Sequence, residues 1–123
     1  MNNEAVDLIK NAVHKKLFVM IRSPKDLDRL EASLTDHLRW MITAEGRGQI
    51  FASGPFTGAG KRPGELGGMT IIRASSLAEA ESIALQDPFI ENGAFSYDIR
   101  EWTLVEGRVS ITVNFSNSAI RVH

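Results

Sequence analysis

Apolar residues along the chain follow two patterns. Some form short continuous or alternating runs, as in strands, and others recur at three- and four-residue steps, as in helices, which indicates a domain that contains both. Leu17 to Ile21 is a continuous apolar run of strand length, and residues 27–41 repeat leucine and methionine at three- and four-residue steps. We therefore predict a strand and then a helix that runs to about Gly46. The same reading predicts strands over residues 49–53, 69–74 and 94–105, with a second helix over residues 77–85.

Two further segments flank this pattern. Residues 3–14 place apolar side chains at helical spacing, which predicts a short leading helix. Residues 109–115 alternate apolar and polar side chains after a turn at Glu106-Gly107, which predicts a strand that closes a hairpin on the preceding one. We predict one domain over residues 1–123 with a core at about 17–106, an N-terminal helical extension at 1–16 and a C-terminal strand extension at 107–123.

The order strand, helix, strand, strand, helix, strand predicts an α+β fold of the ferredoxin-like βαββαβ kind. In this sandwich two helices cover one face of an antiparallel sheet. The other face would expose apolar side chains, and a second copy of the chain is the simplest cover for it. We expect a homodimer or a higher homo-oligomer.

Composition and charge exclude several classes of partner but identify none. The 123 residues include 14 basic and 15 acidic side chains, a formal net charge of -1, and no cysteine. This balance argues against nucleic acid as a partner, and the apolar runs are too short to span a membrane. The absence of cysteine excludes disulfides and thiolate metal sites and fits the reducing conditions of a cytoplasmic protein. His14, His37 and His123 lie far apart and without metal-ligand spacing, so we expect no metal.

A glycine-rich stretch at residues 54–68 predicts a long loop that can shape a pocket. Gly58-Ala59-Gly60-Lys61 lacks the spacing and the hydroxyl residue of a phosphate-binding loop, so we reject a nucleotide site. Lys61 and Arg62 either meet an anionic ligand group or are simply solvated, and solvation is the favoured interpretation.

His37 is the most unusual polar residue of the first helix. It follows Leu34 by three positions and Leu30 by seven, which places the imidazole at the flank of the apolar stripe. Periodicity alone favours a semi-buried histidine whose hydrogen bonds are satisfied over a functional one. Asp87, in turn, precedes Pro88 after the second helix, where an Asp-Pro pair is commonly a turn or helix stop.

Taken in order, these residues resemble the YciI-like family, the small YCII-related domains of the dimeric α+β barrel group. The resemblance covers residues 17–106 approximately. It includes Thr35-Asp36-His37-Leu38, Ala52-Ser53-Gly54-Pro55, Ser76-Leu77-Ala78-Glu79-Ala80 and Asp87-Pro88-Phe89.

The resemblance implies that His37 and Asp87 form an active pair, with the carboxylate orienting the imidazole as a general base. It also implies a substrate-binding region at Ser53, Gly54, Pro55 and Phe89, where backbone N–H groups would hold a developing oxyanion. The implied ligand is a small phenol or organic acid, and the implied reaction is that of a dehydrochlorinase-like lyase or an isomerase that needs no cofactor.

Two other hypotheses stay open at this point. The same pocket would also suit a non-catalytic small-molecule-binding or regulatory module, which would bind its ligand without turnover. A purely structural protein would instead need His37 and Asp87 to be unpaired and the pocket to be filled.

Overall fold

The computed structural model describes residues 2–123, which divide into two compact units. The larger unit is Lys16–Thr103. The smaller unit combines the described residues up to Lys15 with Leu104–His123.

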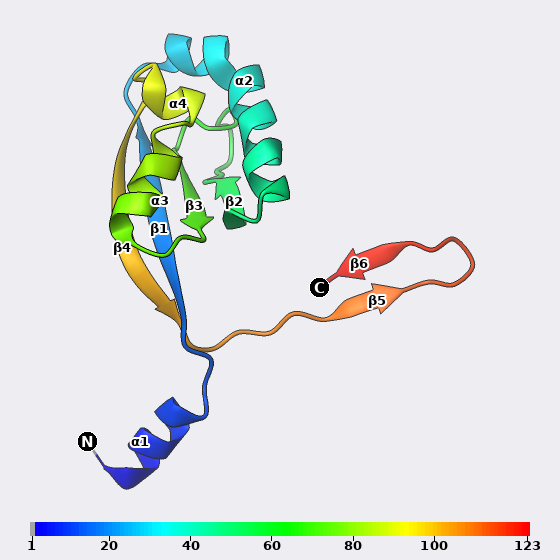
Figure 1. The fold of residues 1–123 in the computed structure, drawn as a ribbon. Coiled ribbons are helices and arrows are strands. Elements are labelled where there is room, and N and C mark those ends of the chain that lie inside the picture. Colours follow the sequence, from blue (N-terminus) through cyan, green and yellow to red (C-terminus); the bar gives the residue numbers. More distant parts are fainter. Residues whose placement is uncertain (1) are drawn as a thin grey trace. The chain divides into compact units, whose positions relative to one another are not determined.

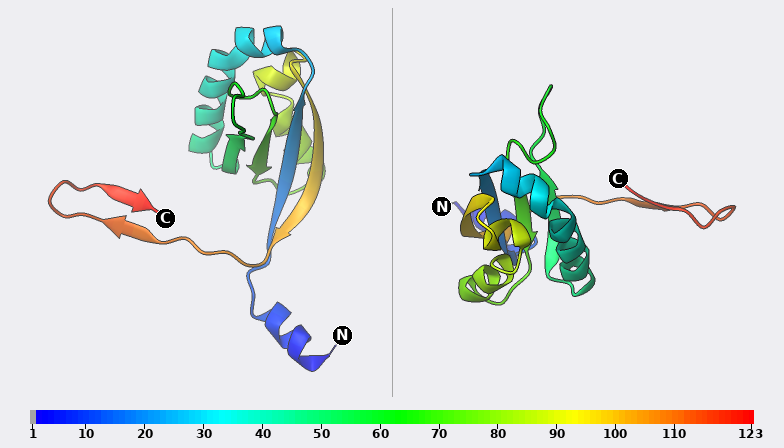
Figure 2. Two further views of the ribbon diagram at one scale, coloured as in Figure 1. Left: turned by 180° about the vertical axis from the view of Figure 1, so that it is seen from behind. Right: turned by 90° about the horizontal axis from the view of Figure 1, so that it is seen from above.

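The larger unit has the predicted ferredoxin-like α+β fold. Its elements, in chain order, are β1 (Lys15–Pro24), α2 (Leu27–Gly46), β2 (Ile50–Pro55), β3 (Gly68–Ile72), α3 (Leu77–Ala84), α4 (Pro88–Glu91) and β4 (Phe95–Leu104). The four strands form one sheet in the order β2-β3-β1-β4, and β3 runs antiparallel to both β1 and β2. The helices of this unit lie on one face of the sheet (Figures 1 and 2).

The strand register decides which side chains face the helices. Phe18 lies opposite Ile72, and Met20 lies opposite Thr70. Because neighbouring residues of a strand point to opposite faces, Arg22, two positions beyond Met20, also faces the helices. The core beneath the helices combines these strand residues with α2, α3, α4 and β4, chiefly through Phe18, Met20, Leu30, Ile72, Ile83, Phe89 and Phe95.

The helices α2 and α3 both begin at side-chain caps. The Asp26 carboxylate accepts hydrogen bonds from the N–H groups of Asp28 and Arg29 at the start of α2. The Ser76 hydroxyl accepts one from the N–H of Glu79 at the start of α3.

No helix within residues 2–123 has the length and apolar character needed to cross a membrane. A cytoplasmic location stays a prediction.

The buried side of α2 differs from the predicted apolar stripe. Leu30 and His37 are buried, whereas Leu34 and Leu38 of the stripe are exposed. The helix is turned so that His37 meets α4, which packs against α2. The exposed Leu34 and Leu38 therefore lie outside the core and form an apolar ridge beside β2.

The smaller unit corrects one prediction about the C-terminus. Here α1 (Asn3–Lys10) is the predicted leading helix, shorter than expected. The strand predicted at residues 109–115, which was expected to pair with the strand at 94–105, is β5 (Ile111–Val113). It pairs instead with β6 (Ile120–Val122), and the two form a separate two-stranded sheet.

The turn that joins β5 to β6 is formed at Asn117 and Ser118 and contains no glycine or proline. The side chain of Asn117 accepts a hydrogen bond from the N–H of Ala119, and Ser118 between them adopts a left-handed φ of 57°. In the resulting register Ile111 faces Val122, and Val113 faces Ile120.

Replacing Phe18 with alanine is expected to lower the free energy of unfolding by about 3–5 kcal/mol, because it removes a fully buried ring from the core. Urea titration followed by tryptophan fluorescence measures this. Phe115→Ala is the matched control, since that ring is 98% exposed and its loss should change the free energy by no more than about 0.5 kcal/mol. Equal losses in the two variants would contradict the placement of the core.

Candidate functional site

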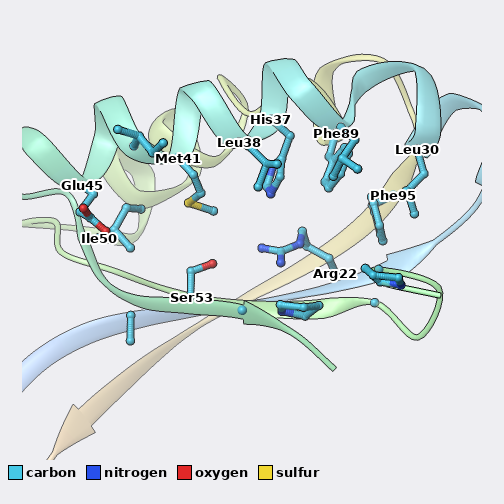
Figure 3. A pocket seen from close by; sticks show the side chains of 18 of the residues that line it. Arg22, Leu30, His37, Leu38, Met41, Glu45, Ile50, Ser53, Phe89 and Phe95 are labelled. Atoms are coloured by element: carbon cyan, nitrogen blue, oxygen red, sulfur yellow. The ribbon is translucent and has the colours of Figure 1, made fainter. Parts of the chain in front are cut away.

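A cavity of about 460 Å³ lies between α2, β2 and the loop that joins β2 to β3. Most of its wall is apolar, and the polar side chains on it are Arg22, His37, Glu45 and Ser53. Figure 3 shows His37 pointing from α2 toward the Arg22 side chain, which reaches in from the sheet. The cavity thus brings an imidazole and a guanidinium together in an otherwise apolar space.

His37 forms a buried hydrogen bond with Asp87. The distance from His37 Nδ1 to Asp87 Oδ1 is 2.7 Å, and both side chains are almost completely buried. An ionised carboxylate only accepts hydrogen bonds, so the Nδ1 atom donates its proton to Asp87. In the neutral ring this leaves the lone pair on Nε2, the nitrogen on the far side of the ring from Asp87.

Asp87 also starts the helix that follows it. Its Oδ1 atom accepts a second hydrogen bond, of 2.9 Å, from the N–H of Phe89, so the carboxylate is the N-cap of α4. The proline at the first helical position, Pro88, fits the start of a helix because it has no N–H to satisfy. One oxygen therefore fixes both α4 and the imidazole.

Phe89 fixes the plane of the imidazole. Its ring stacks on that of His37 with centroids 3.8 Å apart and an interplanar angle of 9°. Phe89 in turn packs against Phe95, with ring centroids 4.8 Å apart. The hydrogen bond to Asp87 and this stacking together restrict rotation of the His37 ring.

Arg22 supplies a buried positive charge on the opposite wall. The residue is only 5% exposed, and its Nη1 atom donates to the hydroxyl of Thr70. Within residues 2–123 no carboxylate forms an ion pair with it, and its Nε has no hydrogen-bond partner. Burial lowers the pKa of the Arg22 guanidinium, and the negative charge of Asp87 partly offsets this effect.

Ser53 continues the polar row that begins at Arg22. The hydroxyls of Ser53 and Thr70 lie 2.8 Å apart, and one donates a hydrogen bond to the other. Guanidinium, threonine hydroxyl and serine hydroxyl therefore follow one another from β1 across β3 to β2. Arg22 and Ser53 of this row line the cavity beside the imidazole, whereas Thr70 is fully buried between them.

The end of the glycine-rich loop makes room for Arg22. A Cβ atom at Gly67, whose φ is +83°, would collide with the carbonyl oxygen of Arg22. A Cβ atom at Gly68 would collide with the Arg22 guanidinium. Both glycines are thus required sterically, while Gly54 has free space around its missing Cβ.

The structure brings the predicted site residues to one place. Ser53, Gly54, Pro55 and Phe89 line the same cavity as His37, and Asp87 lies behind the imidazole. An oxyanion role for backbone N–H groups near Gly54 stays a prediction.

The two basic residues of the glycine-rich loop lie outside this cavity. Neither Lys61 nor Arg62 lines it, and Arg62 forms an exposed ion pair with Glu31 instead.

Sequence reasoning missed Arg22. The residue follows the apolar run of β1 and precedes Ser23-Pro24, so it was interpreted as the end of the strand. The signal that would have found it is the alternation of Phe18, Met20 and Arg22, which places all three on the helix-covered face.

Within the described residues, no three of the His, Asp and Glu side chains gather as a metal site would require.

Comparison with known proteins bears on this site. The family model of the YCII-related domain matches residues 15–103. Among solved structures, the chain is similar to 5-chloro-2-hydroxyhydroquinone dehydrochlorinase (TftG) from Burkholderia phenoliruptrix AC1100, in complex with 2,5-dihydroxybenzoquinone. The two share 26% sequence identity with a TM-score of 0.59 over 70% of this chain and 92% of that chain. No curated protein matches the chain.

The hydrogen bond to Asp87 predicts the tautomer of His37. We expect neutral His37 to carry its proton on Nδ1 in long-range ¹H–¹⁵N spectra recorded above neutral pH. His14 is the internal control, because its Nε2 atom faces the carbonyl oxygen of Ile9 and must carry the proton. Asp87→Ala should move the His37 proton toward Nε2 and leave His14 unchanged, whereas an Nε2 proton on His37 in the unaltered protein would contradict the pair.

Proposed function

The chain belongs to the family of YCII-related domains, and on that premise we propose that it is a cofactor-independent lyase or isomerase acting on a small phenol or organic acid. His37 is the general base and Asp87 orients it. The observation that carries the proposal is the buried hydrogen bond of 2.7 Å from His37 Nδ1 to Asp87 on the wall of a cavity.

The Asp87 carboxylate orients the imidazole toward its role as a base. It holds the proton on Nδ1, so the lone pair of Nε2 is the one available to a ligand. Because His37 lines the cavity, a ligand bound there can reach this ring nitrogen.

The proposed step needs only side chains of this chain. Nε2 of His37 removes a proton from a hydroxyl or from an acidic C–H group of the ligand. In an elimination, the electron pair left behind forms a new double bond, and the leaving group departs with its bonding pair. In an isomerisation, the same nitrogen returns the proton to a different carbon atom.

Arg22 stabilises the negative charge that this step creates. Its guanidinium is buried in the same cavity and has no carboxylate ion-pair partner within residues 2–123. A fixed cation in a site of low dielectric constant acts more strongly on a developing oxyanion than it would in water. The hydroxyl of Ser53, joined to Arg22 through Thr70, extends this row of donors.

The structural relative supports the reaction class. Its name describes loss of hydrogen chloride from a chlorinated hydroxyhydroquinone, and its structure holds a dihydroxybenzoquinone. A hydroxylated aromatic ring would offer this chain an acidic O–H for His37 and an anionic oxygen for Arg22.

His37→Ala should lower turnover by at least about 100-fold, the usual contribution of a positioned general base. Chloride release from 5-chloro-2-hydroxyhydroquinone measures turnover, with a wider panel of halogenated and unsaturated acids and phenols if that compound is inert. His14→Ala is the matched control, because His14 hydrogen-bonds only to the backbone of the smaller unit.

The panel also separates the enzyme from the binding module. Turnover that survives His37→Ala would contradict the base assignment. Ligand binding that depends on Arg22, with no turnover of any compound, would favour the non-catalytic alternative.

We further propose that two copies pair through the sheet face that carries no helix. The register places Val19 opposite Ile71 and Ile21 opposite Met69, on the face opposite to the core. Ile71 is buried and the other three are partly exposed, so apolar side chains fill the centre of this face. A second copy is the cover that this surface fits.

Ile21→Lys is expected to shift the protein from dimer to monomer in sedimentation velocity, because it places a charge at the centre of the apolar face. Thr43→Lys adds the same charge on an exposed part of α2 and should leave the dimer intact. A monomer in the unaltered protein at micromolar concentration would contradict the pairing.

A further inference from the structure

We propose that the ligand is an amphiphilic monoanion. Its carboxylate or phenolate head lies at Arg22, and its apolar tail, the size of a four-carbon chain or a second ring, lies along Leu38, Met41 and Ile42 of α2. This inference rests on the proposed function and specifies the substrate class of the same site.

The cavity is larger than a single ring requires. A cavity of about 150 Å³ is enough to hold benzene. The cavity beside His37 measures about 460 Å³, a size typical of sites for larger organic ligands. A reacting ring placed at His37 and Arg22 would leave more than half of this volume for the rest of the ligand.

The two ends of the cavity differ in chemistry. At one end lie the buried side chains of Arg22, His37 and Phe89. Figure 3 shows Met41 farther along α2, directed across the cavity, with Ile50 beyond it on the side away from Phe89. A ligand that uses the whole cavity is therefore polar at the Arg22 end and apolar along Met41 and Ile50, where Glu45 is the polar side chain of the wall.

The apolar end is incompletely covered by the chain itself. Leu38 is 51% exposed and Ile42 is 70% exposed, although both line the cavity. They are four residues apart on α2, so they lie on the same side of the helix. An apolar tail laid against them would remove their surface from water, which is the main driving force for such contacts.

The charges of the cavity limit the ligand to one negative group. Arg22 is the buried cation at the inner end and attracts the head. Glu45 is the exposed carboxylate on the wall near Ile50, and Figure 3 shows it at the opposite end of the cavity. A second anionic group on the tail would be repelled there, so a dicarboxylate fits less well than a monoanion.

The test compares benzoate, 4-butylbenzoate and the neutral 4-butylbenzamide, with dissociation constants from ¹H–¹⁵N NMR titration. Each methylene that becomes buried should tighten binding about threefold to fourfold, so the butyl tail should give a gain on the order of 100-fold over benzoate. The amide should bind at least about 10-fold more weakly than the matching acid, because it lacks the charge that Arg22 attracts.

Two variants locate the tail. The double variant Leu38→Gln, Ile42→Gln should abolish most of the gain from the butyl group and leave the affinity for benzoate within about twofold. Leu77→Gln is the matched control on α3, because Leu77 is 48% exposed and does not line the cavity.

The outcomes separate this inference from the proposed function. Binding of 4-butylbenzoate in preference to 4-butylbenzamide, with no gain over benzoate, would overturn the inference and leave the proposed function standing. A gain that persists in the double variant would overturn the tail position. If none of the acids binds in preference to its amide, the Arg22 head site fails, and the inference falls with it.

Discussion

A single carboxylate oxygen, Oδ1 of Asp87, joins the parts of this structure on which the site depends. It accepts hydrogen bonds from the N–H that begins α4 and from the ring of His37. A buried carboxylate is stable only when its charge is compensated. Here two N–H donors meet Oδ1 and the guanidinium of Arg22 lies nearby, while Oδ2 has no hydrogen-bond partner within residues 2–123. The capping of a four-residue helix and the orientation of the His37 imidazole therefore depend on the same oxygen.

The position of Arg22 places demands on the surrounding backbone. A guanidinium within the sheet needs space that strand neighbours normally fill, and Gly68 provides it by having no side chain. Gly67 makes room for the backbone carbonyl of Arg22. The polar row through Thr70 to Ser53 then engages one of its donors. The long loop before β3 therefore contacts the site where Gly67 and Gly68 meet Arg22 and where Gly64, which lines the cavity, lies against Leu30.

Sequence patterns predicted the element order of the larger unit because each strand and helix has its own period and a recognisable stop. Periodicity marked His37 only as an unusual position and Asp87 as a turn residue, and the family resemblance implied that they pair. The folded chain shows the hydrogen bond between them across 50 residues. Arg22 was missed because a charged residue at the end of an apolar run resembles a strand end. The run from Leu17 to Ile21 is apolar at every position, so it does not show which side chains face the helices, and the register is what places Arg22 with Phe18 and Met20. The C-terminal hairpin was missed because its turn is made by Asn117 and Ser118 without glycine or proline.

The clamped ring of His37 has a stereochemical consequence. Held by Asp87 on one edge and by Phe89 on its face, the imidazole has one nitrogen to offer and cannot turn over to carry a proton elsewhere. A hydrogen that leaves the ligand and one that returns to it would therefore use the same side of the molecule. An isomerisation here would be suprafacial. Part of an isotopic label on the transferred hydrogen would be retained in the product and not exchanged with solvent.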